Sequence, residues 1–96
     1  MKDIIVKKEF KEDFVTRAAG EKLRHRILSL TKNCKKSEVD FSGITVGSSS
    51  FFDEGIAKLV DEGWNRKKLS ELVSLKAIHK LDLKVLECAL KFRRWR

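Results

Sequence analysis

The chain alternates short apolar runs of strand type with longer segments in which apolar residues recur at helical spacing. The first run lies within residues 3–9 and the last is Leu72-Val73-Ser74-Leu75. Between and after them, apolar residues three or four positions apart predict amphipathic helices. Strands that alternate with helices favour parallel pairing through crossover connections. The sequence therefore predicts an α/β fold, with helices packed on a small sheet that is mixed or largely parallel.

Three helices are predicted from their apolar faces and their end residues. The first begins after Thr16, a favourable N-cap residue, and the last is capped by Asp82. The middle helix begins near Ser50 and ends at Gly63, a natural C-cap. Apolar and polar side chains alternate over residues 39–42, which predicts a short strand. The apolar positions of the three helices include Ala19, Leu23, Ile27, Leu30, Phe52, Ile56, Leu59, Val60, Leu83, Leu86 and Leu90.

The 96 residues contain no proline, repeat or low-complexity linker, so we expect one domain over residues 1–96. No apolar run is long enough to span a bilayer, and the N-terminal run is too short for a signal peptide. The two cysteines and two histidines are dispersed, so no metal or cofactor is expected. Cys88 lies among apolar positions of the last helix and is expected to be buried. These features predict a cytoplasmic protein with no membrane role.

The net charge of +8 is unevenly distributed along the chain. Residues 1–38 carry a charge of +5, residues 39–63 carry −4, and residues 64–96 carry +7. Basic flanks of this kind suggest an acidic protein partner or a nucleic acid. The alternative is an ordinary solvated surface rich in lysine and arginine.

Three consecutive serines lead into the middle helix. Ser50, with Asp53 three residues later, is close to a capping box and is assigned to the helix N-cap. Asp53 and Glu54 then lie in the first turn, where negative charge complements the helix dipole. One cap needs one hydroxyl, so Ser48 and Ser49 remain for turn structure, for partner contact or for phosphorylation.

The segment Val39–Glu54 resembles a STAS-like family of uncharacterised bacterial proteins. In that family a strand ending in Asp-Phe-Ser-Gly-Val precedes a serine-rich turn and a helix that opens with Ser-Phe-x-Asp-Glu. The similarity extends upstream to Thr16-Arg17 and Gly20-x-x-Leu23-Arg24, and so covers roughly residues 15–62. More distantly, the chain is similar to the STAS domain of anti-sigma factor antagonists and anion transporters. The resemblance implies a small STAS-like domain.

The STAS motif runs Asp-x-Ser-x-x-x-x-x-Asp-Ser-Ser/Thr-Gly, and a partner kinase phosphorylates the first serine after the second aspartate. The resemblance implies that Asp40 and Ser42 form the strand-end pair and that Ser49 is the phosphoacceptor. This chain departs from the motif at Ser48, where the family has aspartate, and at Phe51, where it has glycine.

The resemblance implies a regulatory protein–protein interaction module of bacterial or phage origin. The resemblance implies a histidine-kinase-like ATPase as the partner that binds the middle helix and phosphorylates Ser49. Partner contacts are expected at Asp40, Ser42, Ser48, Ser50, Asp53 and Glu54. The sequence has no Ser/His/Asp or Cys/His arrangement and no glycine-rich phosphate loop, so we do not expect an enzyme.

The alternative function is that of a nucleic-acid-binding accessory protein. The C-terminal tail interleaves cations with aromatic rings, which suits phosphate contact and base stacking. The same composition suits docking on an acidic protein surface, or the frayed end of the last helix. The residues concerned are Lys91, Arg93, Arg94, Trp95 and Arg96.

Overall fold

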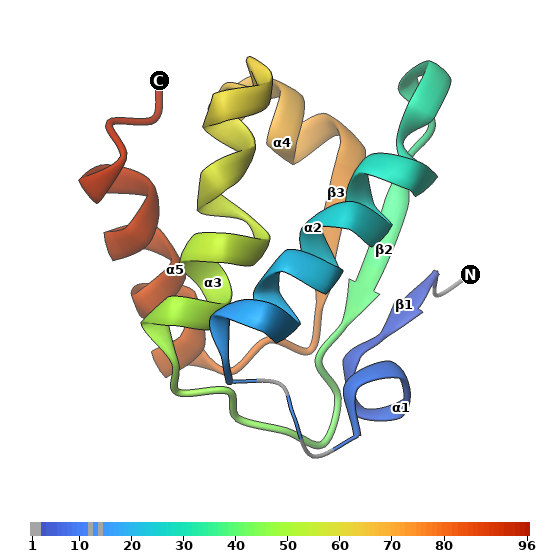
Figure 1. The fold of residues 1–96 in the computed structure, drawn as a ribbon, viewed down its shortest axis with the longest axis vertical. Coiled ribbons are helices and arrows are strands. Elements are labelled where there is room, and N and C mark those ends of the chain that lie inside the picture. Colours follow the sequence, from blue (N-terminus) through green and yellow to red (C-terminus); the bar gives the residue numbers. More distant parts are fainter. Residues whose placement is uncertain (1–2, 12, 14) are drawn as a thin grey trace.

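The computed structural model describes residues 3–11, 13 and 15–96. Three strands form one parallel sheet in the order β1-β2-β3 (Figure 1). The strands are β1 (Ile4–Ile5), β2 (Ser37–Asp40) and β3 (Val73–Lys76). The predicted α/β class is confirmed, with a fully parallel sheet in which β1 and β3 are the edge strands.

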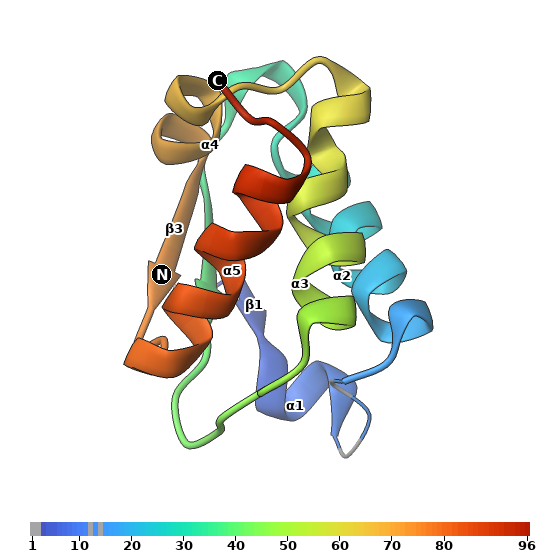
Figure 2. The same cartoon turned by 90° about the vertical axis from the view of Figure 1, so that its left-hand side faces the viewer.

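Helical segments fill the connections between the strands and follow the last one. They are α1 (Val6–Phe10), α2 (Arg17–Leu30), η1 (Lys32–Cys34), α3 (Ser49–Gly55), η2 (Ala57–Glu62), α4 (Arg66–Leu72) and α5 (Lys80–Phe92). Both crossovers progress in the same direction across the sheet, and right-handed crossovers of this kind place their helices on one face. Figure 2 shows this arrangement, with β2 and β3 on the left and α2 and α3 to their right.

The register of the strands separates an apolar face of the sheet from a polar one. Ile4, Val39 and Leu75 are aligned across the sheet and contribute to the core beneath the helices. Asp40 and Lys76 are aligned in the next row, whose side chains point to the opposite face. Lys76 is exposed there, whereas Asp40 is buried.

The closest helix packing is between α2 and α3, which approach each other through glycine. A Cβ atom on Gly20 of α2 would lie 2.7 Å from the carbonyl oxygen of Phe51 and 2.8 Å from the Cβ of Glu54. Gly55 of α3 is equally close to α2, since a Cβ there would lie 2.9 Å from a methyl carbon of Leu23. In the core around this contact, the ring of Phe51 packs edge-on against those of Phe10 and Phe52.

The strand predicted over residues 3–9 is confirmed only at Ile4–Ile5. Val6 and Phe10 lie one helical turn apart and are both buried, while Lys7 and Lys8 between them are exposed. In a helix, residues four positions apart lie on the same face, so both side chains reach the core. The chain therefore forms α1 after Ile5 instead of continuing as a strand.

Helix α4 was not predicted, and it shifts the start of the last strand from Leu72 to Val73. Asn65 caps α4 by accepting a hydrogen bond from the N–H of Lys68 at 2.8 Å. Leu69 and Leu72 lie three positions apart on the side of the helix that faces the core.

The predicted middle helix is divided in two. Helix α3 ends at Gly55 and is followed by the 3-10 segment η2. The predicted C-cap at Gly63 is confirmed, because this residue ends η2 in the left-handed conformation with φ of 83°. Cys88 is exposed on α5, so its predicted burial is wrong: it lies two residues from the buried Leu86 and Leu90, off the face that they form.

Candidate functional site

The candidate site begins where β2 ends, at a turn built by Asp40 and Ser42. The carboxylate Oδ1 of Asp40 accepts hydrogen bonds from the N–H of Ser42 at 3.0 Å and from its hydroxyl at 2.5 Å. Gly43 follows with φ of 77°, a conformation that favours glycine. The strand-end pair implied by the resemblance is therefore a local turn, with Asp40 buried and Ser42 exposed.

Asp82 fixes the loop that runs from this turn to α3. Its carboxylate is fully buried and accepts hydrogen bonds from the N–H of Val46 at 2.7 Å and of Gly47 at 2.8 Å. The sequence assigned Asp82 to the cap of the last helix, but His79 occupies that position and accepts from the N–H of Leu81 through Nδ1. The assignment was wrong because Asp82 lies within the first turn of α5 and bonds to a distant segment.

Ser48, not Ser50, is the N-cap of α3. The Ser48 hydroxyl accepts a hydrogen bond from the N–H of Phe51 and donates one to the carbonyl of Val15. The second bond ties the cap to the segment that enters α2, and the sequence offers no local sign of it. Ser50 instead lies in the first turn of α3 and is half-buried.

Ser49 is the first residue of α3, and its side chain is exposed to solvent. Within the described part of the chain, its hydroxyl makes no hydrogen bond. The three serines thus divide into a cap at Ser48, an exposed hydroxyl at Ser49 and a half-buried one at Ser50.

The two acidic residues of α3 accept hydrogen bonds from basic side chains of α2 and of the C-terminal end of α5. Asp53 accepts two hydrogen bonds from Arg93, at 2.6 and 2.9 Å, and one from Arg17 at 3.0 Å. Glu54 accepts from Arg17 at 3.2 Å and from Arg24 at 3.1 Å. The basic flanks therefore neutralise Asp53 and Glu54, two of the five acidic residues in the segment 39–63.

These contacts shift the ionisation of both carboxyl groups. The hydrogen bond from Arg93 and that from Arg17 together lower the pKa of Asp53 from 3.8 to about 2, although burial acts in the opposite direction. Burial would raise the pKa of Glu54, but Arg24, Lys58 and Arg17 outweigh it and lower that pKa. Both groups are carboxylates at neutral pH.

The C-terminal tail proposed to contact nucleic acid is largely used within the fold. Trp95 is buried and donates a hydrogen bond from Nε1 to the carbonyl of Ala57 at 2.7 Å. Arg93 pairs with Asp53, and the carbonyl of Arg96 accepts from the N–H of Arg66 at 2.6 Å. Base stacking on Trp95 is excluded in this conformation because its ring is covered. The side chains of Lys91, Arg94 and Arg96 are exposed.

The parallel sheet with its helices, and the serine-bearing loop before α3, agree with the small STAS-like domain that the sequence resemblance implies. The model of the family described as a STAS-like domain of unknown function matches residues 19–80. This match covers more than half of the chain, so the protein belongs to that family and the resemblance is confirmed. No curated protein and no solved structure matches the chain.

Two further properties concern the described residues alone. Across residues 3–11, 13 and 15–96, no three His, Cys, Asp or Glu side chains gather in a group suited to a metal ion. In the same residues, no helix combines the length and the apolar character that a membrane span requires.

Proposed function

We propose that the protein is a regulatory protein–protein interaction module that is switched by phosphorylation of Ser49. The observation that carries the proposal is the contrast between two neighbouring hydroxyls. Ser49 is exposed at the start of α3, whereas Ser48 is held by Phe51 and Val15. A kinase requires an exposed hydroxyl, and Asp82 keeps the preceding loop in a fixed position.

The charges around Ser49 give the phosphate a physical effect. Ser49 lies one helical turn before Asp53, so the two side chains are neighbours on α3. A phosphate of about −2 charge repels Asp53 and competes with it for Arg17, whose side chain is 57% exposed. Loss of the bond between Arg17 and Asp53 alters the surface that α2 and α3 present together. Phosphorylation then acts as a release signal for a partner that recognises the unmodified surface.

The partner in this proposal is a histidine-kinase-like ATPase, as in the STAS domains that the chain resembles. Its contacts fall on the exposed or partly exposed residues at the start of α3, with Ser42 at the edge of the same loop. Asp40 acts indirectly, because its buried carboxylate shapes the turn that presents Ser42. The protein is a substrate and a switch in this scheme, and it catalyses no reaction itself.

The experiment incubates the protein and ATP with a histidine-kinase-like ATPase from the same genome. We expect a mass gain of one phosphate, mapped to Ser49 by peptide sequencing. Ser49→Ala should abolish the gain, and Ser50→Ala is the matched control that should retain it. Ser49→Asp should weaken partner binding by about tenfold or more, while Ser29→Asp, on the exposed side of α2 and outside the proposed contacts, changes it little. A phosphate on Ser42 or Ser50, or unchanged binding by Ser49→Asp, would contradict the proposal.

A further inference from the structure

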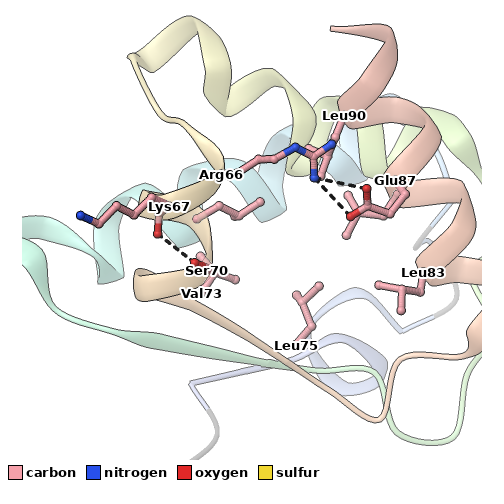
Figure 3. A pocket seen from close by; sticks show the side chains of 10 residues that line it. Arg66, Lys67, Ser70, Val73, Leu75, Leu83, Glu87 and Leu90 are labelled. Atoms are coloured by element: carbon pink, nitrogen blue, oxygen red, sulfur yellow. Dashed lines mark hydrogen bonds and ion pairs between the residues drawn. The ribbon is translucent and has the colours of Figure 1, made fainter. Parts of the chain in front are cut away.

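A groove lies between the edge strand β3 and the helices α4 and α5 (Figure 3). No residue of the loop before α3 (residues 43–48, the serine loop) lines it. Its volume is about 420 Å³, within the range of ligand-binding clefts. The apolar side chains that line it are Leu69, Val73, Leu75, Leu83, Leu86 and Leu90. Leu83 is 44% exposed at its mouth, and Arg66 pairs with Glu87 across one side at 3.2 Å.

The groove adjoins a strand edge with backbone groups directed outward. The carbonyl of Lys76 accepts a hydrogen bond from the N–H of Phe41, so Lys76 and, by alternation, Ser74 direct their backbone groups toward β2. Leu75 then directs both its N–H and its carbonyl away from the sheet. Val73 offers only its carbonyl, since its N–H bonds to Leu69 at the end of α4. In the described part of the chain, no strand pairs with this edge.

We propose that an extended acidic segment of a partner protein adds to β3 as a fourth strand. Side chains alternate across a strand, so every second residue of the segment would point into the groove. Those positions take apolar side chains that contact Leu75, Leu83 and Leu86. The intervening positions lie on the opposite face of the sheet, beside the exposed Lys76, and take aspartate or glutamate.

The charge around the groove selects an acidic occupant. The three elements that frame it, α4, β3 and α5, carry seven Lys and Arg against three Asp and Glu. One of those three acids is Asp82, which is buried and bonded to the serine loop. A second copy of this chain is a poorer occupant. It would place two β3 edges, each with Lys76, side by side, and each copy carries a net charge of +8, so the two would repel each other.

The test uses a synthetic peptide that alternates glutamate with valine, titrated into ¹⁵N-labelled protein. Two variants place the same charge on neighbouring positions of α5. Leu83→Asp alters the groove wall, whereas Leu81→Asp alters a leucine that is 59% exposed and does not line the groove. Thermal melts followed by circular dichroism show whether each variant is folded before binding is compared.

We expect amide shifts at residues 73–76 and slower hydrogen exchange at the N–H of Leu75 when the peptide binds. Leu83→Asp should weaken binding by about tenfold, Leu81→Asp by less than about twofold, and a lysine–valine peptide should not bind. Equal weakening by both variants would overturn the proposal, as would shifts confined to other surfaces or no binding at all. A dimer of the free protein that Leu83→Asp dissociates would also overturn it, since the groove would then hold a second copy.

Discussion

Asp53 joins three segments that are distant in the sequence. Its carboxylate accepts hydrogen bonds from Arg17, at the start of α2, and from Arg93, at the end of α5. The side chain is 15% exposed, so these bonds are only partly screened by water. From the sequence alone, Asp53 was assigned to the helix dipole and to partner contact. In the fold its carboxylate connects α3 to α2 and to the end of α5 through these hydrogen bonds. Partner contact by this residue remains a prediction.

The stability of the protein should depend on the ionisation of Asp53. Its pKa in the folded state, about 2, lies below the ordinary value of 3.8, so folding favours the carboxylate. The stabilisation is complete above about pH 4 and is lost as the pH falls toward 2. We expect Asp53→Asn to lower the free energy of unfolding by about 1 to 2 kcal/mol at pH 7 and by much less at pH 2.

The free energy of unfolding of the unmodified protein and of Asp53→Asn is measured by urea unfolding between pH 2 and pH 7. Asp61→Asn is the control, because Asp61 lies 3.8 Å from Arg93 but is 61% exposed. It should change the free energy of unfolding by less than about 0.5 kcal/mol. Equal losses for Asp53→Asn at pH 7 and pH 2 would show that the ion pairs do not stabilise the fold.

The sequence predicted that one serine would cap the middle helix, but it assigned that role to Ser50 instead of Ser48. Each of the three serines is a suitable N-cap by its chemistry, and Asp53 three residues after Ser50 favoured the wrong one. The bond between Ser48 and Val15 crosses 33 positions, and local sequence carries no trace of it. The role of Asp82 was missed for the same reason, although an acid beside the buried positions of α5 was a sign of a buried acceptor.

At the scale of elements, the α2–α3 contact depends on the absence of side chains. Gly20 and Gly55 each face the opposite helix at distances that leave no room for a methyl group. Gly20 belongs to the segment on which the family resemblance rests, and its place in the packing gives a physical reason for a glycine there.

Gly20→Ala should destabilise the protein by about 1 to 3 kcal/mol, because the added methyl meets the backbone carbonyl of Phe51. The intrinsic helix preference of alanine acts in the opposite direction by about 1 kcal/mol. Ser29→Ala on the exposed side of α2 is the matched control and should be neutral or slightly stabilising. Thermal unfolding measures both, and a stabilised Gly20→Ala variant would mean that the helices can separate at little cost.

The long helices α2 and α5 were predictable from the sequence, and the short helices α1 and α4 were not. The 14 residues of α2 and the 13 of α5 each show several turns of apolar spacing. Helices α1 and α4 have 5 and 7 residues, too few turns to separate a helical period from a strand-like run. Their form is decided by burial against the rest of the molecule.

At the scale of the whole molecule, the chain closes on itself through its C-terminal tail. Trp95 is 7% exposed and bonds to the carbonyl of Ala57 in η2, while Arg96 bonds through its carbonyl to the start of α4. Arg93 in the same tail pairs with Asp53, so the basic tail and the acidic middle segment, separate in sequence, neutralise each other in part. This closure was not predictable, because a tail rich in cations and aromatic rings is equally suited to an external partner.

Trp95→Ala should lower the free energy of unfolding by about 3 to 5 kcal/mol, since it leaves a cavity and removes a buried hydrogen bond. Phe92→Ala is the control, because that ring is 86% exposed and its loss should cost less than about 0.5 kcal/mol. Chemical denaturation followed by circular dichroism compares the two. Similar small losses in both variants would place the Trp95 ring outside the core.

The two hydrogen bonds that Asp82 accepts from the serine loop also determine when, during synthesis of the chain, this loop can reach its final conformation. Val46 precedes Asp82 by 36 residues, so the loop leaves the ribosome well before the carboxylate that fixes it. Nascent chains that have not yet produced α5 cannot hold Ser49 in its final setting. Synthesis of α5 is thus a condition for presenting this hydroxyl, and a kinase that reads the folded loop would act only on chains that have produced this helix.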